Sequence, residues 1–326
     1  IQKVMQNNEN ESLDLEKQYE NVVKQREELP LTETVAEEPV NLGKVQMDRF
    51  ATQKAEDADF HLGYHPIPVI NLPSGGMFYP EGTEISIRSA KVAEIRHFST
   101  IDETNILDVD DKLNNIVESC TRVLSGTKKM SYKDLCEEDR FYVILSIRDL
   151  TFPEPESKLT VDHLDKTGEK HTIEIKKEYF QYFKIPETLD KYYDMESKSF
   201  LIETKSFGTI EMKPPTIGVM QKMTAYIREK QKTGGKVDQS VLQIMPYLVT
   251  EWRGFTDNDI FRFEVDMNGW SNKKYSLIYK LAEQMKMGIQ PNMLVEIGDD
   301  EEVVPISFRD GIKSLFIVQD FAGELL

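Results

Sequence analysis

The spacing of apolar residues predicts helices in the middle of the chain. One predicted helix carries its apolar residues three and four positions apart, which places them on one face: Leu113, Ile116, Val117, Cys120 and Leu124. Gly126 is expected to end this helix, because glycine readily adopts the left-handed conformation found at helix ends. A second helix begins near Tyr132 or Glu138 and is closed by Pro153 and Pro155. It is apolar nearly all round, so we expect it to be buried.

Alternating apolar and polar residues predict short strands, at residues 84–88, 158–164, 171–175, 200–203 and 209–213. Gly168 and Gly208 lie between successive strands, where a hairpin turn needs a residue with positive φ. Pro214 and Pro215 then open a predicted helix at about residues 216–230, since proline is tolerated in the first helical turn. This part of the chain is therefore expected to be a mixture of helices and hairpins.

The chain after Gly234 is predicted to be largely helical. Residues 241–252 and 275–285 each form an apolar face with helical spacing, the second ended by Gly288, and residues 312–319 form a shorter one. The acidic run 299–302 is interpreted as a solvated loop between them.

The first 62 residues differ in composition from the rest. They are rich in Glu, Gln, Asn and Lys and contain few aromatic residues. A thin apolar stripe predicts an amphipathic helix that stops before Pro30: Leu15, Tyr19, Val22, Val23 and Leu29. Residues 31–41 have no hydrophobic period and are expected to be a linker. Two alternatives are left open, a disordered segment and an arm that becomes ordered on a neighbouring subunit.

These patterns predict an α+β fold. We expect a mixed α/β body with short strands and hairpins, a helical C-terminal region and an extended N-terminal arm. The expected divisions are an acidic, partly helical arm at residues 1–62, an α+β domain at residues 63–230 and a mainly helical region at residues 231–326.

Composition excludes several classes of protein. The net charge is −17, whereas nucleic-acid binding requires clustered Lys and Arg, so no nucleic acid is expected as a partner. No apolar run approaches the roughly 18 residues of a membrane span, so no membrane association is expected. The chain has only two cysteines, which favours a reducing compartment over a disulfide scaffold. Its first ten residues have no secretory-signal pattern.

Candidate metal ligands are sparse. His61 and His65 have the spacing of a helical metal site, but Gly63 and Pro66 argue against a helix there. Cys120 lies on the apolar face described above and is interpreted as a buried core residue. Zinc could be held by Cys120 and Cys136 only if His163 and His171 came from the hairpin to complete the site. We therefore expect no metal and no cofactor.

Acidic residues gather before two of the predicted helices. Asp110 follows Asp108 closely in the first group, and Glu138 is adjacent to Asp139 in the second. Paired carboxylates can serve in acid–base catalysis, but acids at this place are usually helix caps and partners of the helix dipole. We interpret Asp108 or Asp110 as the cap of the first helix and Glu138 or Asp139 as the cap of the second. No catalytic residues are predicted.

The most informative segment is Leu72–Ser89, a tight turn that leads into the strand at 84–88. In this turn the prolines fix φ, the glycines permit positive φ, and two large side chains can pack against the body. The residues of the turn are Leu72, Pro73, Gly75, Tyr79, Pro80 and Gly82. Its pattern, Leu-Pro-Ser-x-Gly-x-x-Tyr-Pro-Glu-Gly, resembles the N-terminal segment of the baseplate hub and hub-assembly proteins of T-even-type contractile-tailed phages. The resemblance covers about residues 70–228 and includes the helix end at 147–151. Some members of that family carry a cysteine-rich, zinc-binding insertion there, but residues 151–158 contain no cysteine.

The resemblance implies a virion structural protein, most directly a tail baseplate hub component that docks on other tail or baseplate proteins in a multi-subunit complex. A non-virion chaperone of hub or tail assembly is the alternative, and an unrecognised tail-associated enzyme, such as a nuclease or peptidoglycan hydrolase, is a third. The implied location is the virion, after synthesis in the bacterial host cytoplasm. Apolar residues of the arm and of the C-terminal tail are candidate interface residues: Leu15, Tyr19, Val22, Leu29, Leu325 and Leu326.

Overall fold

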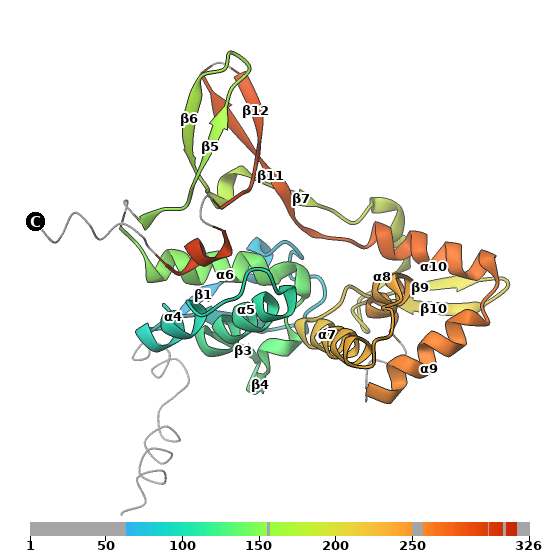
Figure 1. Cartoon of the computed structure of the whole chain (residues 1–326). Coiled ribbons are helices and arrows are strands. Elements are labelled where there is room, and N and C mark those ends of the chain that lie inside the picture. Colours follow the sequence, from blue (N-terminus) through green and yellow to red (C-terminus); the bar gives the residue numbers. More distant parts are fainter. Residues whose placement is uncertain (1–62, 155–156, 250–256, 299, 309–310, 318–326) are drawn as a thin grey trace, which may run out of the picture. The chain divides into compact units, whose positions relative to one another are not determined.

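The computed structural model describes residues 63–154, 157–249, 257–298, 300–308 and 311–317 (Figure 1). In these residues, helices alternate with small antiparallel sheets, so the predicted α+β class is confirmed. The expected N-terminal arm and its stripe lie outside the described residues, as do Leu325 and Leu326. No helix within the described ranges is long and apolar enough to cross a membrane.

The first sheet is formed by the segments before and after two helices. Its four strands pair in the order β1 (His65–Ile67), β2 (Thr83–Ile87), β3 (Thr121–Ser125) and β4 (Lys128–Met130). The helices of this region are α4 (Val92–Phe98), α5 (Ile106–Cys120) and α6 (Glu137–Thr151). As expected from its apolar sequence, the middle of α6 is buried, since every residue from Val143 to Arg148 is at most 6% exposed.

Two further groups of strands lie side by side (Figure 1). One is the hairpin β5 (Thr160–Leu164) and β6 (Lys170–Glu174), and the other is a sheet with the order β12-β11-β7. The strands of this sheet are β7 (Phe180–Phe183), β11 (Gly288–Ile297) and β12 (Asp300–Pro305). His163 Nε2 lies 2.7 Å from Glu302 Oε2, which joins β5 to β12.

The third sheet has the order β10-β9-β8 and lies among four helices. Its strands are β8 (Tyr193–Asp194), β9 (Ser199–Thr204) and β10 (Gly208–Met212). The helices are α7 (Ile217–Lys232), α8 (Gln239–Ile244), α9 (Asp257–Asn268) and α10 (Asn272–Gln284). Helix α7 begins where the sequence indicated, because the Thr216 hydroxyl caps it by accepting a hydrogen bond from Val219 N.

Short 3-10 helices connect these elements. They are η1 (Val69–Asn71), η2 (Tyr132–Asp134), η4 (Lys177–Tyr179), η5 (Glu187–Tyr192), η6 (Met245–Tyr247) and η8 (Ile312–Leu315).

The described residues form two hydrophobic cores. The first is formed largely by residues between Ile67 and Phe180, and Met293, Val304 and Phe316 return to it from the end of the chain. The second is formed by Phe78 and by residues between Leu189 and Met285. This second core includes residues from both sides of residue 230, where a domain boundary was expected. That boundary stays a prediction.

The predicted helix through Leu124 is wrong at its end. Helix α5 stops at Cys120, and the next residues form β3, whose Val123 is buried against the sheet. Gly126 does not cap the helix but forms the turn between β3 and β4, with φ of 56°. Leu124 matched the helical spacing by coincidence, and the hydrogen bonds offered by β2 favoured a strand.

The helical interpretation of the C-terminal region is also incomplete. Gly288 begins β11 rather than ending a helix, and Glu302 lies in β12 rather than in a solvated loop. Buried residues alternate along these strands, as at Met293 and Val295, so the region closes part of the first core. Trp252 and Asp299 lie outside the described residues, and the predicted helix at 312–319 is represented by the short helix η8.

Candidate functional site

The segment that carries the resemblance, Leu72–Gly82, is a compact turn between η1 and β2. Leu72, Phe78 and Tyr79 are each only 4% exposed. Gly75 and Gly82 have φ of 60° and 70°, the left-handed region that glycine adopts without strain. The turn is therefore part of the folded body, with its apolar residues in the two cores.

Asp139 in the first turn of α6 binds this segment. Its side chain is completely buried and accepts three hydrogen bonds, from Ser74 N at 2.8 Å and from the hydroxyls of Ser74 and Tyr79 at 2.6 Å each. The Tyr79 oxygen in turn accepts a hydrogen bond of 3.0 Å from Cys136 N. Ser74 and Tyr79 belong to the sequence pattern, so the polar residues of the pattern hold the turn against α6.

The environment of this group shifts its ionisation. Burial raises the pKa of Asp139, and the hydrogen bonds from Ser74 and Tyr79 lower it in part. The pKa of Tyr79 lies well above its usual value, chiefly because of burial and then because of the neighbouring Asp139. Tyr79 consequently keeps its proton and remains a hydrogen-bond donor to the carboxylate.

The two glutamates before Asp139 are partly buried. Burial raises the pKa of Glu137 to about 7 and that of Glu138 to about 8. The Cys136 thiol donates to Glu138 Oε2 at 3.1 Å, and Arg140 Nη2 pairs with Glu137 Oε1 at 2.7 Å. These carboxyl groups can exchange protons near neutral pH, but each already has a partner within the protein.

The interpretation of the acidic residues as helix caps is corrected in both helices. The cap of α5 is Asn105, whose Oδ1 accepts from Leu107 N at 3.1 Å, and Asp110 instead pairs with Arg140. Cys136 occupies the cap position of α6 without a side-chain capping bond. Asp139 faces the turn at Ser74, because a buried carboxylate is stabilised by the donors of that turn.

The four candidate zinc ligands do not form one cluster in the described part of the chain, although His163 and His171 lie opposite each other in the β5–β6 hairpin. Cys120 Sγ lies 3.5 Å from Glu94 Oε2, and Cys136 is bound to Glu138 as above. Both cysteines are buried core residues, as expected for Cys120. His65 lies exposed on β1, and His61 is outside the described residues.

A different group, Asp165, Glu169 and His171, has ligand atoms within 4.8 Å of one another. It surrounds the β5–β6 turn. The Asp165 carboxylate there accepts hydrogen bonds from Thr167 N, Glu169 N and His171 Nε2 at 2.8–2.9 Å. The hydrogen bonds of the hairpin turn therefore explain why these three side chains lie close together.

Sequence reasoning identified the turn residues but missed Ser74 and Asp139 as partners. A signal was present, because a carboxylate within the first turn of a helix that is apolar all round requires nearby donors once it is buried. The predicted interface residues of the arm and tail lie outside the described ranges. Ile70, Val92 and Ile106, which are exposed and apolar on the described surface, were not predicted.

Comparisons with protein-family models, with curated proteins and with solved structures found no match to this chain.

Proposed function

We propose that this chain is a structural protein of a bacteriophage virion, a component of the tail baseplate hub that acts by docking on other baseplate proteins. The observation that carries the proposal is the structural role of the Leu72–Gly82 segment. Its polar residues Ser74 and Tyr79 bind Asp139, and its apolar residues enter both cores. The residues that carry the resemblance to the hub family thus help to build the body, which supports a role in assembly rather than in a reaction.

The charge of the chain supports docking on proteins rather than on nucleic acid. A net charge of −17 repels phosphate backbones and favours partners with basic surfaces. The candidate interface residues Leu15, Tyr19, Val22 and Leu29 supply apolar contacts if the N-terminal segment becomes ordered on such a partner.

Quantitative mass spectrometry of purified mature particles, from the phage that encodes this chain, tests the proposal. We expect the chain at a constant copy number relative to other baseplate proteins. Presence in baseplate assembly intermediates together with absence from mature particles would assign the chaperone role instead. Absence from both would contradict any part in tail assembly.

A further inference from the structure

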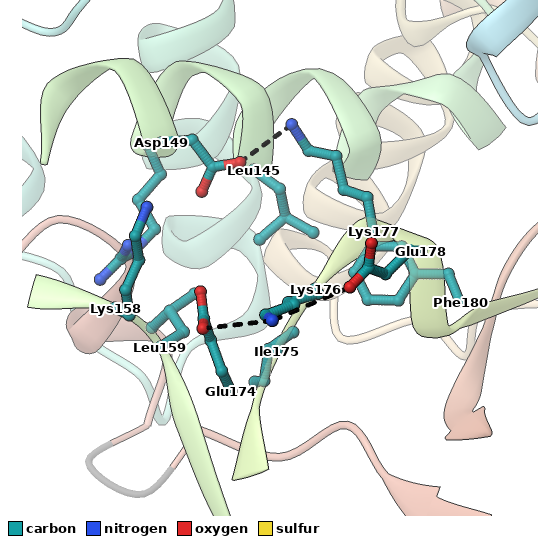
Figure 2. A pocket seen from close by; sticks show the side chains of 11 residues that line it. Leu145, Asp149, Lys158, Leu159, Glu174, Ile175, Lys176, Lys177, Glu178 and Phe180 are labelled. Carbon is teal, nitrogen blue, oxygen red and sulfur yellow. Dashed lines mark ion pairs between the residues drawn. The ribbon is translucent and has the colours of Figure 1, made fainter. Parts of the chain in front are cut away.

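A pocket of about 290 Å³ lies between the C-terminal half of α6 and the β5–β6 hairpin (Figure 2). Helix α6 contributes Arg148 and Asp149, and the hairpin with the segments beside it contributes Lys158 and residues 174–178. Leu145, Leu159 and Phe180 form apolar walls. The pocket therefore combines apolar walls with charged groups from both sides.

The charges in the pocket do not balance. It contains four cationic side chains, Arg148, Lys158, Lys176 and Lys177, but three carboxylates, Asp149, Glu174 and Glu178. Two lysines are paired with all three carboxylates, as Figure 2 shows. Lys177 Nζ lies 2.9 Å from Asp149, and Lys176 Nζ lies 3.8 Å from both Glu174 and Glu178. One positive charge remains in excess.

Of the four cations in the pocket, Arg148 and Lys158 are the two that form no ion pair with a described carboxylate. Arg148 is only 2% exposed, and one of its terminal nitrogens donates to the Ser157 carbonyl. Its Nε is buried with no hydrogen-bond partner, and its guanidinium lies over the Phe152 ring at 5.6 Å. Asp149 beside it acts on the guanidinium electrostatically but forms no ion pair with it. An unpartnered buried donor commonly indicates a missing water, ion or ligand.

We propose that this pocket binds a single carboxylate group, which Arg148 and Lys158 hold. A guanidinium presents parallel donors that match the two oxygens of a carboxylate. One negative charge neutralises the excess in the pocket, whereas a phosphate dianion would leave the pocket negative. The volume of about 290 Å³ suits a group of side-chain size.

The carboxylate can belong to an acidic side chain of a partner polypeptide or to a small organic acid. Both present the same chemistry to Arg148 and Lys158. The assignment is independent of the larger assembly in which the chain takes part.

Titrations of the full chain at constant ionic strength test the proposal, followed through the Nε–Hε resonance of Arg148 by NMR. The probes are acetate, N-acetyl-glutamate amide, the neutral N-acetyl-glutamine amide and inorganic phosphate. We expect both carboxylates to shift the resonance saturably and the neutral amide to leave it unchanged. Tighter binding of N-acetyl-glutamate amide than of acetate would identify a polypeptide side chain as the source, and the reverse order a small acid.

Substitutions identify the pocket as the place of binding. Lys158→Gln removes one charged contact and should weaken carboxylate binding about tenfold. Lys170→Gln is the matched control, because Lys170 lies on β6 with 61% of its side chain exposed and is not part of the pocket. Arg148→Lys keeps the charge but loses the paired donors, and if it fails to fold, the Lys158 variant decides.

The proposal is overturned if neither carboxylate shifts the Arg148 resonance. It is also overturned if phosphate binds more tightly than both carboxylates, or if Lys158→Gln and Lys170→Gln weaken binding equally.

Discussion

Asp139 is the residue on which the position of the Leu72–Gly82 turn depends. It lies 65 positions from Ser74 and 60 positions from Tyr79 in the sequence, yet it bonds to both. A buried carboxylate is costly unless donors surround it, and here a turn and a helix provide that environment together. The polar residues of the turn therefore determine where the turn lies on α6.

Replacing Tyr79 by Phe tests this arrangement. The change removes one donor to Asp139 and leaves Cys136 N–H without its acceptor, both in a buried site. We expect the free energy of unfolding, measured in urea, to fall by about 1–3 kcal/mol. Tyr275→Phe is the control, since the Tyr275 hydroxyl makes no hydrogen bond to the described residues, and it should change stability little. Equal stability of the two variants would show that the Tyr79 hydroxyl does not hold the turn.

Glu138 should make stability depend on pH. Burial raises its pKa from about 4.5 in the unfolded chain to about 8, so between these values the folded protein holds a proton that the unfolded chain has released. Stability contributed by this group is therefore present at low pH and is lost as the pH rises through that interval. Glu138→Gln should flatten the decline in urea-unfolding free energy between pH 5 and pH 8.

Glu84→Gln is the matched control for that change, because it removes an exposed carboxylate of the same kind. If the unfolding free energies of the Glu138→Gln and Glu84→Gln proteins changed with pH in the same way, burial of Glu138 would not be the cause of the decline.

At the scale of elements, the turn at Gly82 connects the Leu72–Gly82 segment to the first sheet. Gly126 N donates to the Gly82 carbonyl at 3.2 Å, which joins this turn to the β3–β4 turn. Both glycines have positive φ, at 70° and 56°. The start of β2 and the end of β3 are thus aligned by two turns that each require glycine-like backbone geometry.

Gly82→Val should destabilise the protein by about 1–3 kcal/mol. The cost is conformational rather than steric, because a Cβ at this position would meet nothing closer than Gly126 N at 3.9 Å. Gly82→Asn should cost less, since asparagine tolerates positive φ better than a β-branched residue does. Thermal denaturation distinguishes these outcomes, and a Val variant as stable as the wild type would show that the turn does not need glycine.

At the scale of the whole molecule, the described residues between Ile67 and Phe316 supply two cores. The N-terminal 62 residues have little apolar surface to offset an ordering cost of roughly 1–2 kcal/mol per residue. We therefore expect deletion of residues 1–62 to leave the melting temperature of the body nearly unchanged and to weaken particle assembly.

A full-length variant with Leu15, Tyr19 and Val22 changed to serine is the control for this deletion, because it removes the apolar stripe without shortening the chain. Melting is followed by circular dichroism and assembly by electron microscopy of particles. Unfolding of the body after deletion would place the arm in its core. Normal assembly without the arm would contradict the docking role.

Local sequence by itself determined α6, the β5–β6 and β9–β10 hairpins and the start of α7. Their signals are periodicity, turn glycines and the proline pair before α7, which act between residues close together in the chain. It also indicated that Leu72–Gly82 is a turn, because proline fixes φ and glycine permits positive φ whatever the surrounding structure.

Only the tertiary structure decided where α5 stops, that Gly288–Pro305 forms a hairpin and that Asp139 binds Ser74 and Tyr79. Each outcome depends on a partner far away in sequence, such as β2 for β3 or His163 for Glu302 at a separation of 139 residues. The charge excess around Arg148 has the same origin, because α6 and the β5–β6 hairpin create it only when they pack together. Local propensity is weak beside the free energy of pairing a strand or compensating a buried charge, so these features follow from the folded chain as a whole.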